Sequence, residues 1–220
     1  MSPPPRTDRR RPHEGAPVKT RTSLLGALAA ATLVLGGCQY FEQSVKDVSA
    51  EFRGITATVE TFDVNANALD RITGRSIQVT TDDRFDITDA EGKITKESSV
   101  LKLTVGGEPV YHVGSSLILA EQGLESVLND ANAKAEVNST DSSIPFLSRL
   151  KTSFDEFFTG KDYTVLIRSQ EGTPIAVYSG DKVSSYSAEG IPNSTVLLID
   201  HKRLFIYRCD YTIYSSELIQ

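Results

Sequence analysis

The chain has 220 residues, of which 39% are hydrophobic and 24% are charged, and its formal net charge is −6. This composition is typical of a globular protein of one or two domains, and it excludes disordered, collagen-like and multi-span membrane chains. The two cysteines exclude a disulfide-dense scaffold and a cysteine-based structural zinc site.

The N-terminal segment differs from the rest of the chain. Residues 1–22 carry six basic side chains and five of the nine prolines, and residues 23–37, SLLGALAAATLVLGG, carry no charge. A basic segment followed by 7–15 apolar residues is typical of a secretory signal peptide, whereas a membrane-spanning helix needs about twenty. We therefore predict that residues 1–37 are a signal peptide.

The end of the apolar stretch, Leu35-Gly36-Gly37-Cys38, resembles the lipobox of bacterial lipoproteins. The resemblance implies cleavage before Cys38 and a diacylglyceryl group on its thiol. Two acyl chains give stable membrane anchoring, so the protein is expected at the extracytoplasmic face of the cell membrane. The alternatives are an uncleaved N-terminal anchor, or a simple secretory signal with an incidental cysteine.

Removal of residues 1–37 changes the charge of the chain. It leaves 17 basic and 27 acidic side chains, a net charge of −10. This acidic body argues against nucleic acid as a partner and against direct adhesion to anionic lipid headgroups. With Cys38 lipidated, Cys209 has no intrachain disulfide partner, and we expect it to be a small buried hydrophobic residue.

The two halves of the chain resemble each other. VKDVSAEFRG and LKTSFDEFFTG are each predicted to form a short helix ending near a glycine, and each precedes a strand-like segment, ITATVETF or DYTVLIRS. The spacing of 105–106 residues places Phe52 on Phe157 and Gly74 on Gly180. Further on, SVL at 99–101 matches TVL at 195–197 at a spacing of 96. We therefore predict an internal duplication, with about ten extra residues between the third and fourth strands of the first half.

Apolar and polar residues alternate in many short segments that are separated by turns of two to four residues, which predicts antiparallel strands. The predicted fold class is α+β, with two similar modules that each contain a short helix and an antiparallel β-meander. The predicted division of the chain is a signal peptide at 1–37, a lipidated tether at 38–42, a first module at 43–124, a linker at 125–144 and a second module at 145–220.

The segments YTVLIRSQEGTPIAVYSGDKV and STVLLIDHKRLFIYRCDYTIYSSE resemble a family of small Gram-positive lipoproteins whose domain has no assigned function. The first half matches more weakly, because it has Asn67-Ala68-Leu69 in place of the Gly-x-Pro-Ile turn. The resemblance implies a β-rich fold and a location at the cell surface, and it brings no catalytic residues.

Sequence motifs for catalysis or for cofactor binding are missing. The chain has no dinucleotide-binding, P-loop, zinc-protease or nucleophile-elbow motif. His112 lies within a predicted strand, and His201 follows Asp200 in a predicted hairpin turn. We therefore expect no enzyme activity and no cofactor.

A group of carboxylates is the best metal candidate: Asp82, Asp83, Asp86, Asp89 and Glu91. If Gly92 is placed at the sixth position of a calcium loop, Ile87 and Ser98 occupy the first and twelfth positions, where carboxylates are needed. We therefore predict no metal site, with Asp86, Asp89 and Glu91 as weak candidates on a solvated hairpin.

Aromatic residues are concentrated in the second half, including Tyr207, Tyr211 and Tyr214 on adjacent predicted strands. Cross-strand pairing explains such density, and a tyrosine-lined groove for a glycan or a peptide is the alternative. The sequence favours a non-catalytic binding or interaction protein at the cell envelope, whose partner would be an envelope protein or a glycan. An extracytoplasmic hydrolase and a structural envelope spacer are the alternatives.

Overall fold

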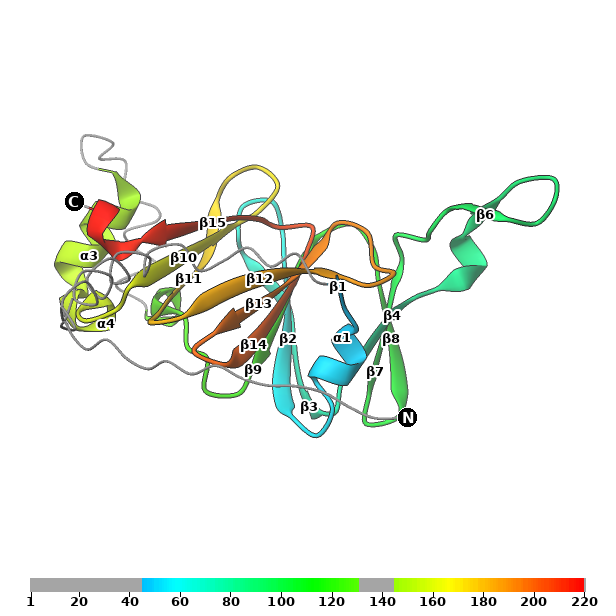
Figure 1. Ribbon diagram of the computed structural model, residues 1–220, viewed down its shortest axis with the longest axis horizontal. Coiled ribbons are helices and arrows are strands. Elements are labelled where there is room, and N and C mark those ends of the chain that lie inside the picture. Colours follow the sequence, from blue (N-terminus) through cyan, green and yellow to red (C-terminus); the bar gives the residue numbers. More distant parts are fainter. Residues whose placement is uncertain (1–44, 131–144, 220) are drawn as a thin grey trace, which may run out of the picture. The chain divides into compact units, whose positions relative to one another are not determined.

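The computed structural model describes residues 45–130 and 145–219, which belong to one compact unit (Figure 1). The fold is β-rich with a few short helices. Its strands are β1 (Val45–Lys46), β2 (Thr56–Phe62), β3 (Ala68–Arg75), β4 (Gln78–Thr81), β5 (Ile87–Thr88), β6 (Ile94–Lys96), β7 (Leu101–Val105), β8 (Glu108–His112), β9 (Ser116–Glu121), β10 (Tyr163–Arg168), β11 (Pro174–Gly180), β12 (Val183–Ala188), β13 (Ser194–Ile199), β14 (Lys202–Tyr207) and β15 (Asp210–Ser215). Its helices are α1 (Val48–Glu51), α3 (Phe146–Ser153) and α4 (Asp155–Phe158), with 3-10 turns η1 (Asp83–Phe85), η2 (Val127–Asn129) and η3 (Ser216–Leu218).

The strands form four sheets. The largest has seven strands in the order β1-β12-β13-β14-β9-β2-β3, two have three strands each, β11-β10-β15 and β4-β7-β8, and β5 and β6 form a two-stranded ribbon. Every pair is antiparallel except β1 with β12. Short connections account for the antiparallel pairs of consecutive strands, as the turn lengths predict, whereas β2-β9, β9-β14 and β10-β15 pair strands that are far apart in the sequence.

The seven-stranded sheet contains strands from both halves of the chain, because β9 pairs with β14 from Leu117↔Tyr207 to Ala120↔Leu204. The two predicted modules, 43–124 and 145–220, therefore share one sheet. Pairing of β9 with β14 satisfies backbone groups that two separate modules would leave exposed at their sheet edges. The expected linker is also too long, since Val127 and Leu128 are buried. Residues 131–144 lie outside the described part.

The strand pairing of the first half is repeated in the second. β2 pairs with β3 and β9 as β10 pairs with β11 and β15, and β4-β7-β8 is a meander like β12-β13-β14. Ala57 faces Gly74 and Tyr163 faces Gly180, which gives an offset of 106 residues. A bulge follows Thr61 in β2 and, at the same offset, Ile167 in β10.

After β4, the sequence offset between equivalent residues of the two halves decreases. Leu103 faces Val110, and Leu197 faces Leu204, so the offset is 94 and not the expected 96. The first half therefore has 12 more residues than the second between β4 and β7. This segment contains η1, β5 and β6 and extends away from β4 and β7 as an arm (Figure 1). Its large apolar residues Phe85, Ile87 and Ile94 are all more than half exposed.

The expected match of Phe52 with Phe157 is wrong by one residue. Phe158, at the offset of 106, is buried like Phe52, whereas Phe157 is only partly buried. Both aromatic residues precede a glycine with positive φ, Gly54 at 76° and Gly160 at 74°. Glycine ends both helical segments because it takes this left-handed conformation without a steric cost.

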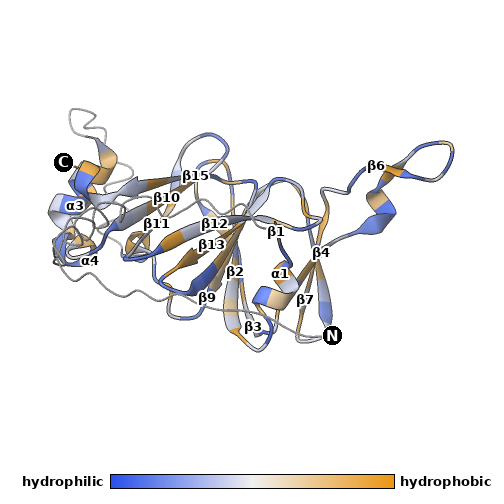
Figure 2. Cartoon of the chain, viewed as in Figure 1, coloured by the Kyte–Doolittle hydropathy of each residue, from blue (hydrophilic) through white to orange (hydrophobic). Residues whose placement is uncertain are grey.

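Three apolar clusters form the core. The first contains residues of α1, of β4 and β7, and of the seven-stranded sheet, including Phe52 and Phe205. The second lies between that sheet and β11-β10-β15, and the third lies between β11-β10-β15 and the segments α3, α4 and η2. Val165 belongs to the second cluster and Leu166 to the third, because successive side chains of a strand point to opposite faces. Figure 2 shows these apolar strands between hydrophilic loops.

No helix in residues 45–130 and 145–219 is long and apolar enough to cross a membrane.

Candidate functional site

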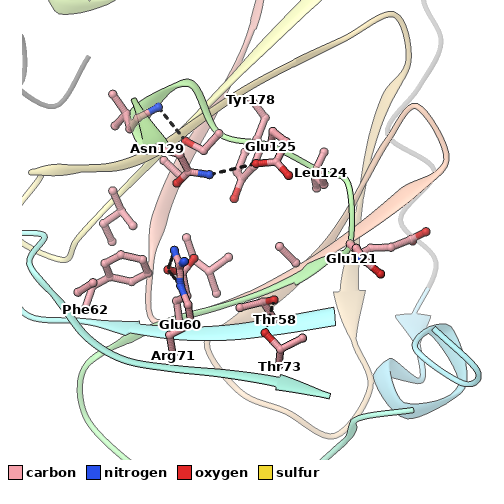
Figure 3. Close-up of a pocket in the computed structure, with 18 of the residues that line it drawn as sticks. Thr58, Glu60, Phe62, Arg71, Thr73, Glu121, Leu124, Glu125, Asn129 and Tyr178 are labelled. Carbon is pink, nitrogen blue, oxygen red and sulfur yellow. Dashed lines mark hydrogen bonds and ion pairs between the residues drawn. The ribbon is translucent and has the colours of Figure 1, made fainter. Parts of the chain in front are cut away.

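A cavity of about 260 Å³ lies between the β2-β3-β9 face of the large sheet and strand β11, and residues 122–129 cover one side of it (Figure 3). The alternation of β2 explains its position. Ala57 and Val59 point into the first apolar cluster, whereas Thr58 and Glu60 point to the opposite face and line the cavity. The cavity therefore lies on a sheet face that carries polar side chains.

Part of the cavity lining is apolar and continues the second core cluster, with residues on both the large sheet and β11. These apolar residues are Phe62, Ala66, Ile118, Ala120, Leu124, Ile175 and Ala176. Phe62, Ile118, Ile175 and Ala176 are buried. A concave site with an apolar wall and a few convergent polar groups is the usual form of a small-molecule pocket.

An ion pair lies on the β2-β3 side of the cavity. Arg71 donates from Nε (2.9 Å) and Nη2 (2.6 Å) to the same oxygen of Glu60, its cross-strand neighbour. Beside this pair, the hydroxyls of Thr58 and Thr73 are 2.9 Å apart and hydrogen-bonded. Arg71 and Glu60 thus largely neutralise each other.

Tyr178 of β11 points into the cavity from the opposite wall (Figure 3). Its side chain is only 4% exposed, and its hydroxyl has no hydrogen-bond partner among the residues that the structure describes. Burial, and next the negative charge of Glu60, raises the pKa of Tyr178 above its usual value. The phenol therefore stays protonated, and its hydroxyl, which is not among the fully buried atoms that lack a partner, is open to the cavity and can bond to a ligand or to water.

The segment from 122 to 129 is fixed to β11 by Ser126. Its Oγ accepts hydrogen bonds from the backbone N–H groups of Val177 (3.0 Å) and Leu128 (3.2 Å). This holds Glu125 at the cavity, where its carboxylate accepts a long hydrogen bond from Asn129 Nδ2 at 3.4 Å (Figure 3). Within the described ranges, Glu125 has no cationic partner.

The other carboxylate at the rim is already paired. Glu121 accepts hydrogen bonds from Arg203 N (3.0 Å) and Arg203 Nη1 (3.1 Å). The nearby ammonium group of Lys202 donates to the carbonyl oxygens of Gly123 (2.7 Å) and Gln122 (3.4 Å). Of the three glutamates that line the cavity, Glu125 is thus the one whose charge is not compensated.

In the second half of the chain, side chains fill the space that corresponds to the cavity. Glu60 and Arg71 correspond, at the offset of 106, to Leu166 and Val177, which face each other across β10 and β11 and are buried. Ala120 corresponds to Tyr214, because Ala120 faces Thr58 as Tyr214 faces Thr164. Tyr214 packs against the third cluster. The cavity therefore occupies a position that side chains fill in the other half.

The weak metal candidates are not brought together by the fold. Asp86 Oδ1 accepts a hydrogen bond from the backbone N–H of Ser98 at 2.7 Å. Asp89 Oδ1 accepts hydrogen bonds from Lys93 N (2.8 Å) and Glu91 N (3.2 Å), and these bonds stabilise the hairpin turn. Across the part of the chain with described coordinates, no three His, Cys, Asp or Glu side chains are grouped closely enough to hold a metal ion.

The two histidines that lie in the described residues, His112 and His201, have structural roles. His112 Nε2 is 2.9 Å from the carbonyl oxygen of Ser115, and its ring packs edge-on against Tyr207 at 5.9 Å between centroids. Asp200 and His201, with φ of 47° and 68°, form the two-residue turn between β13 and β14. Positive φ at both positions is typical of the tight turns that join hairpin strands.

Cys209 is partly buried against the second core cluster, and so is more exposed than the sequence predicts. Its thiol lies 3.4 Å from the carbonyl oxygen of Tyr207 and 3.7 Å from that of Leu117. Burial raises the pKa of Cys209 to about 11, so the thiol is protonated at neutral pH. This is the environment of a structural cysteine.

The alternative of one tyrosine-lined groove is wrong. Tyr207 is fully buried in the first cluster and its hydroxyl donates to the carbonyl of Ser99, whereas Tyr211 packs on the second cluster and Tyr214 on the third. These tyrosines therefore lie on different faces of the fold.

Sequence reasoning did not single out Glu60, Arg71 or Glu125, and it included Tyr178 only as one of the many aromatic residues of the second half. A signal was present for the first two, because at the offset of 106 a charged pair stands where the second half has Leu166 and Val177. The predicted lipobox residues Leu35, Gly36 and Gly37 and the predicted lipidation site Cys38 lie outside the described residues.

The chain belongs to the protein family defined by the domain of unknown function DUF5052, whose model matches residues 20–219. No curated protein and no solved structure matches the chain.

Proposed function

We propose that this protein is a lipid-anchored lipoprotein of the cell envelope that binds a small ligand in the β2-β3-β9 cavity and does not catalyse a reaction. The observation that carries the binding function is the cavity itself, into which the largely buried side chain of Tyr178 presents its hydroxyl. A hydroxyl can donate one hydrogen bond and accept others, and no described residue occupies that of Tyr178, so it can bond to a ligand in the cavity.

The proposed location rests on the N-terminal sequence. A basic segment, a short apolar stretch and the sequence Leu35-Gly36-Gly37-Cys38 follow one another in the order of a lipoprotein signal. The family match begins at residue 20 and therefore includes Cys38. The resemblance to small Gram-positive lipoproteins supports the same location, and the acidic remainder of the chain makes the lipid the main source of membrane affinity.

We also infer that the two halves arose by duplication, since they share strand pairing, bulge position and helix-ending glycines. On this view the first half has replaced a packed apolar pair, the counterpart of Leu166 and Val177, with Glu60 and Arg71. It has also replaced the counterpart of Tyr214 with Ala120. These replacements open a polar cavity where packing would be expected, which is typical of a binding site grafted on a fold.

Catalysis is not favoured by the reactive side chains that the structure places. His112 is engaged with a backbone carbonyl, His201 is exposed in a turn, and Cys209 is a protonated thiol. A nucleophilic mechanism needs a nucleophile within hydrogen-bond reach of a base. None of these three side chains forms such a pair with another in the described segments. The cavity favours a binding protein over a structural spacer.

The anchoring is tested with Cys38→Ser, with Cys209→Ser as the matched control. Metabolic labelling with a radioactive fatty acid and membrane fractionation are measured for both variants. We expect label and membrane attachment in the control, and a soluble or unprocessed chain without label for Cys38→Ser. A Cys38→Ser protein that is still cleaved after Gly37 and still attached to the membrane would refute lipid anchoring.

The binding is tested by filling the cavity with the side chain that the second half uses. Ala120→Tyr copies Tyr214, and Lys96→Tyr, on the exposed strand β6, is the matched control. A library of small amines, sugars and carboxylates is screened by ligand-observed NMR. Compounds should bind to the wild type and to Lys96→Tyr but not to Ala120→Tyr. Binding that persists in Ala120→Tyr would contradict this site.

A further inference from the structure

We propose that the ligand of this cavity is an aliphatic primary amine, whose ammonium group lies between the carboxylate of Glu125 and the hydroxyl of Tyr178. The proposal rests on the proposed binding function and adds the chemical class of the ligand. It places the alkyl chain of the amine against the apolar wall that includes Phe62 and Ile175.

The charges around the cavity favour a cation. Glu60, Glu121 and Glu125 line it together with a single cation, Arg71. Arg71 is bound to Glu60 through two nitrogens, and Arg203 and Lys202 lie near the rim but are engaged by Glu121 and by backbone carbonyls. Within the described residues, the uncompensated charge is that of Glu125, whose side chain is exposed to solvent. A carboxylate ligand would meet this charge with no free cation beside it in the described residues.

The hydrogen-bonding groups also match an ammonium group. An ammonium group has three donors and no acceptor. The carboxylate of Glu125 accepts one long hydrogen bond from the side-chain amide of Asn129 and has further lone pairs free to accept. The phenolic oxygen of Tyr178 can also accept a hydrogen bond. Burial is the main reason that the pKa of Tyr178 is raised, and the negative charges of Glu60 and Glu125 add to the shift, so the same two charges attract a cation to this side of the cavity.

The remainder of the cavity suits a short carbon chain. Ile118, Ile175 and Ala176 are buried apolar residues on the walls, and the cavity of about 260 Å³ is at the small end of ligand sites. A neutral alcohol of the same length would make the same apolar contacts. It would lose the charge-assisted hydrogen bond, which is worth more than a neutral one and corresponds to about tenfold in affinity.

The experiment compares three probes of equal chain length: n-butylamine, 1-butanol and butyrate. The amine is protonated at pH 7, as the side chain of lysine is. Dissociation constants are measured by ligand-observed NMR titration of the full chain in detergent micelles, with protein-free micelles as the blank. We expect butylamine to bind about tenfold more tightly than butanol, and butyrate to bind least.

Three variants locate the ammonium group. Glu125→Gln removes the charge and keeps the shape, and Tyr178→Phe removes only the hydroxyl. Glu91→Gln, on the exposed arm, is the matched control for the loss of one negative charge. Glu125→Gln should weaken butylamine about tenfold and leave butanol unchanged, Tyr178→Phe should weaken butylamine severalfold, and Glu91→Gln should change neither.

The outcomes separate the two proposals. If butanol binds as well as butylamine and both are lost in Ala120→Tyr, the amine class is wrong while the cavity remains a binding site. The amine class is also wrong if butyrate binds best, or if Glu125→Gln leaves butylamine unaffected. If no probe binds and the screen of small molecules is also negative, the binding function itself fails, and the amine proposal fails with it.

Discussion

Exchanging the two equivalent cross-strand pairs should have very unequal effects on stability. One double variant, Glu60→Leu/Arg71→Val, gives the first half the apolar pair of the second. The reverse variant, Leu166→Glu/Val177→Arg, gives the second half the ion pair of the first. Both changes exchange the same residue types at equivalent register positions.

The magnitudes follow from exposure. The Arg71 side chain is 66% exposed and that of Glu60 is 21% exposed, and an ion pair of this kind contributes about 0–1 kcal/mol to the free energy of unfolding. An apolar cross-strand pair contributes about 0.2–1 kcal/mol, so the first variant should stay within about 1 kcal/mol of wild type. Leu166 and Val177 are buried, so the reverse variant places two charges in an apolar cluster and should lose at least about 3 kcal/mol.

The assay is urea unfolding followed by far-UV circular dichroism, because the chain has no tryptophan. A loss of more than about 3 kcal/mol in Glu60→Leu/Arg71→Val would show that the ion pair is a structural requirement and not a feature of an open site. The reasoning would equally be refuted if Leu166→Glu/Val177→Arg unfolded at the wild-type urea concentration.

Tyr207→Phe should lower the free energy of unfolding by about 1–3 kcal/mol in urea, because it leaves the carbonyl of Ser99 without its donor; an unchanged midpoint would contradict this. Gly180→Ala should cost about 1–3 kcal/mol, since the added Cβ would lie 2.8 Å from Ile199 Cγ2, and a calorimetric melting temperature equal to wild type would refute it. Cys209, with its pKa raised to about 11 from 9.0, should react slowly with iodoacetamide at pH 8 until urea unfolds the chain. As the pH rises, the thiol of the unfolded chain ionises at a lower pH than that of the folded chain. Cys209 should therefore leave the free energy of unfolding unchanged below pH 9 and lower it between pH 9 and 11, and Cys209→Ala should reduce this loss.

Local patterns in the sequence predict much of the fold. The alternation in DYTVLIRS predicts a strand, and β10 runs from Tyr163 to Arg168. The glycines after Phe52 and Phe158 mark the helix ends, and the β5-β6 arm lies between β4 and β7, where the sequence predicts extra residues in the first half. These features depend on neighbours in the chain, so the sequence contains them directly.

The joining of the halves could not be predicted in the same way. The pairing of β9 with β14 brings together residues 84 to 90 positions apart, from Ala120 with Leu204 to Leu117 with Tyr207, and no turn connects them. The ladder offset of 94 also differs from the spacing of 96 suggested by matching SVL to TVL. Side-chain similarity and ladder register need not coincide, and a shift of two residues keeps each side chain on the same face.

The cavity was missed for a related reason. Glu60 and Arg71 read as ordinary solvent-facing residues of a strand pair, and Tyr178 reads as an ordinary core aromatic. What makes them a candidate site is the cover that residues 122–129 and β11 provide over one side of the sheet. That cover depends on tertiary packing, which the pattern of a single strand does not contain.

A crystal structure of the protein soaked with n-butylamine would test the central claim most directly. We predict electron density for the amine in the cavity between β2, β9 and β11, with its nitrogen within hydrogen-bond distance of both Glu125 and the hydroxyl of Tyr178. The contrary result is a cavity closed by side chains, with the Tyr178 hydroxyl bonded to another protein group and no amine beside it.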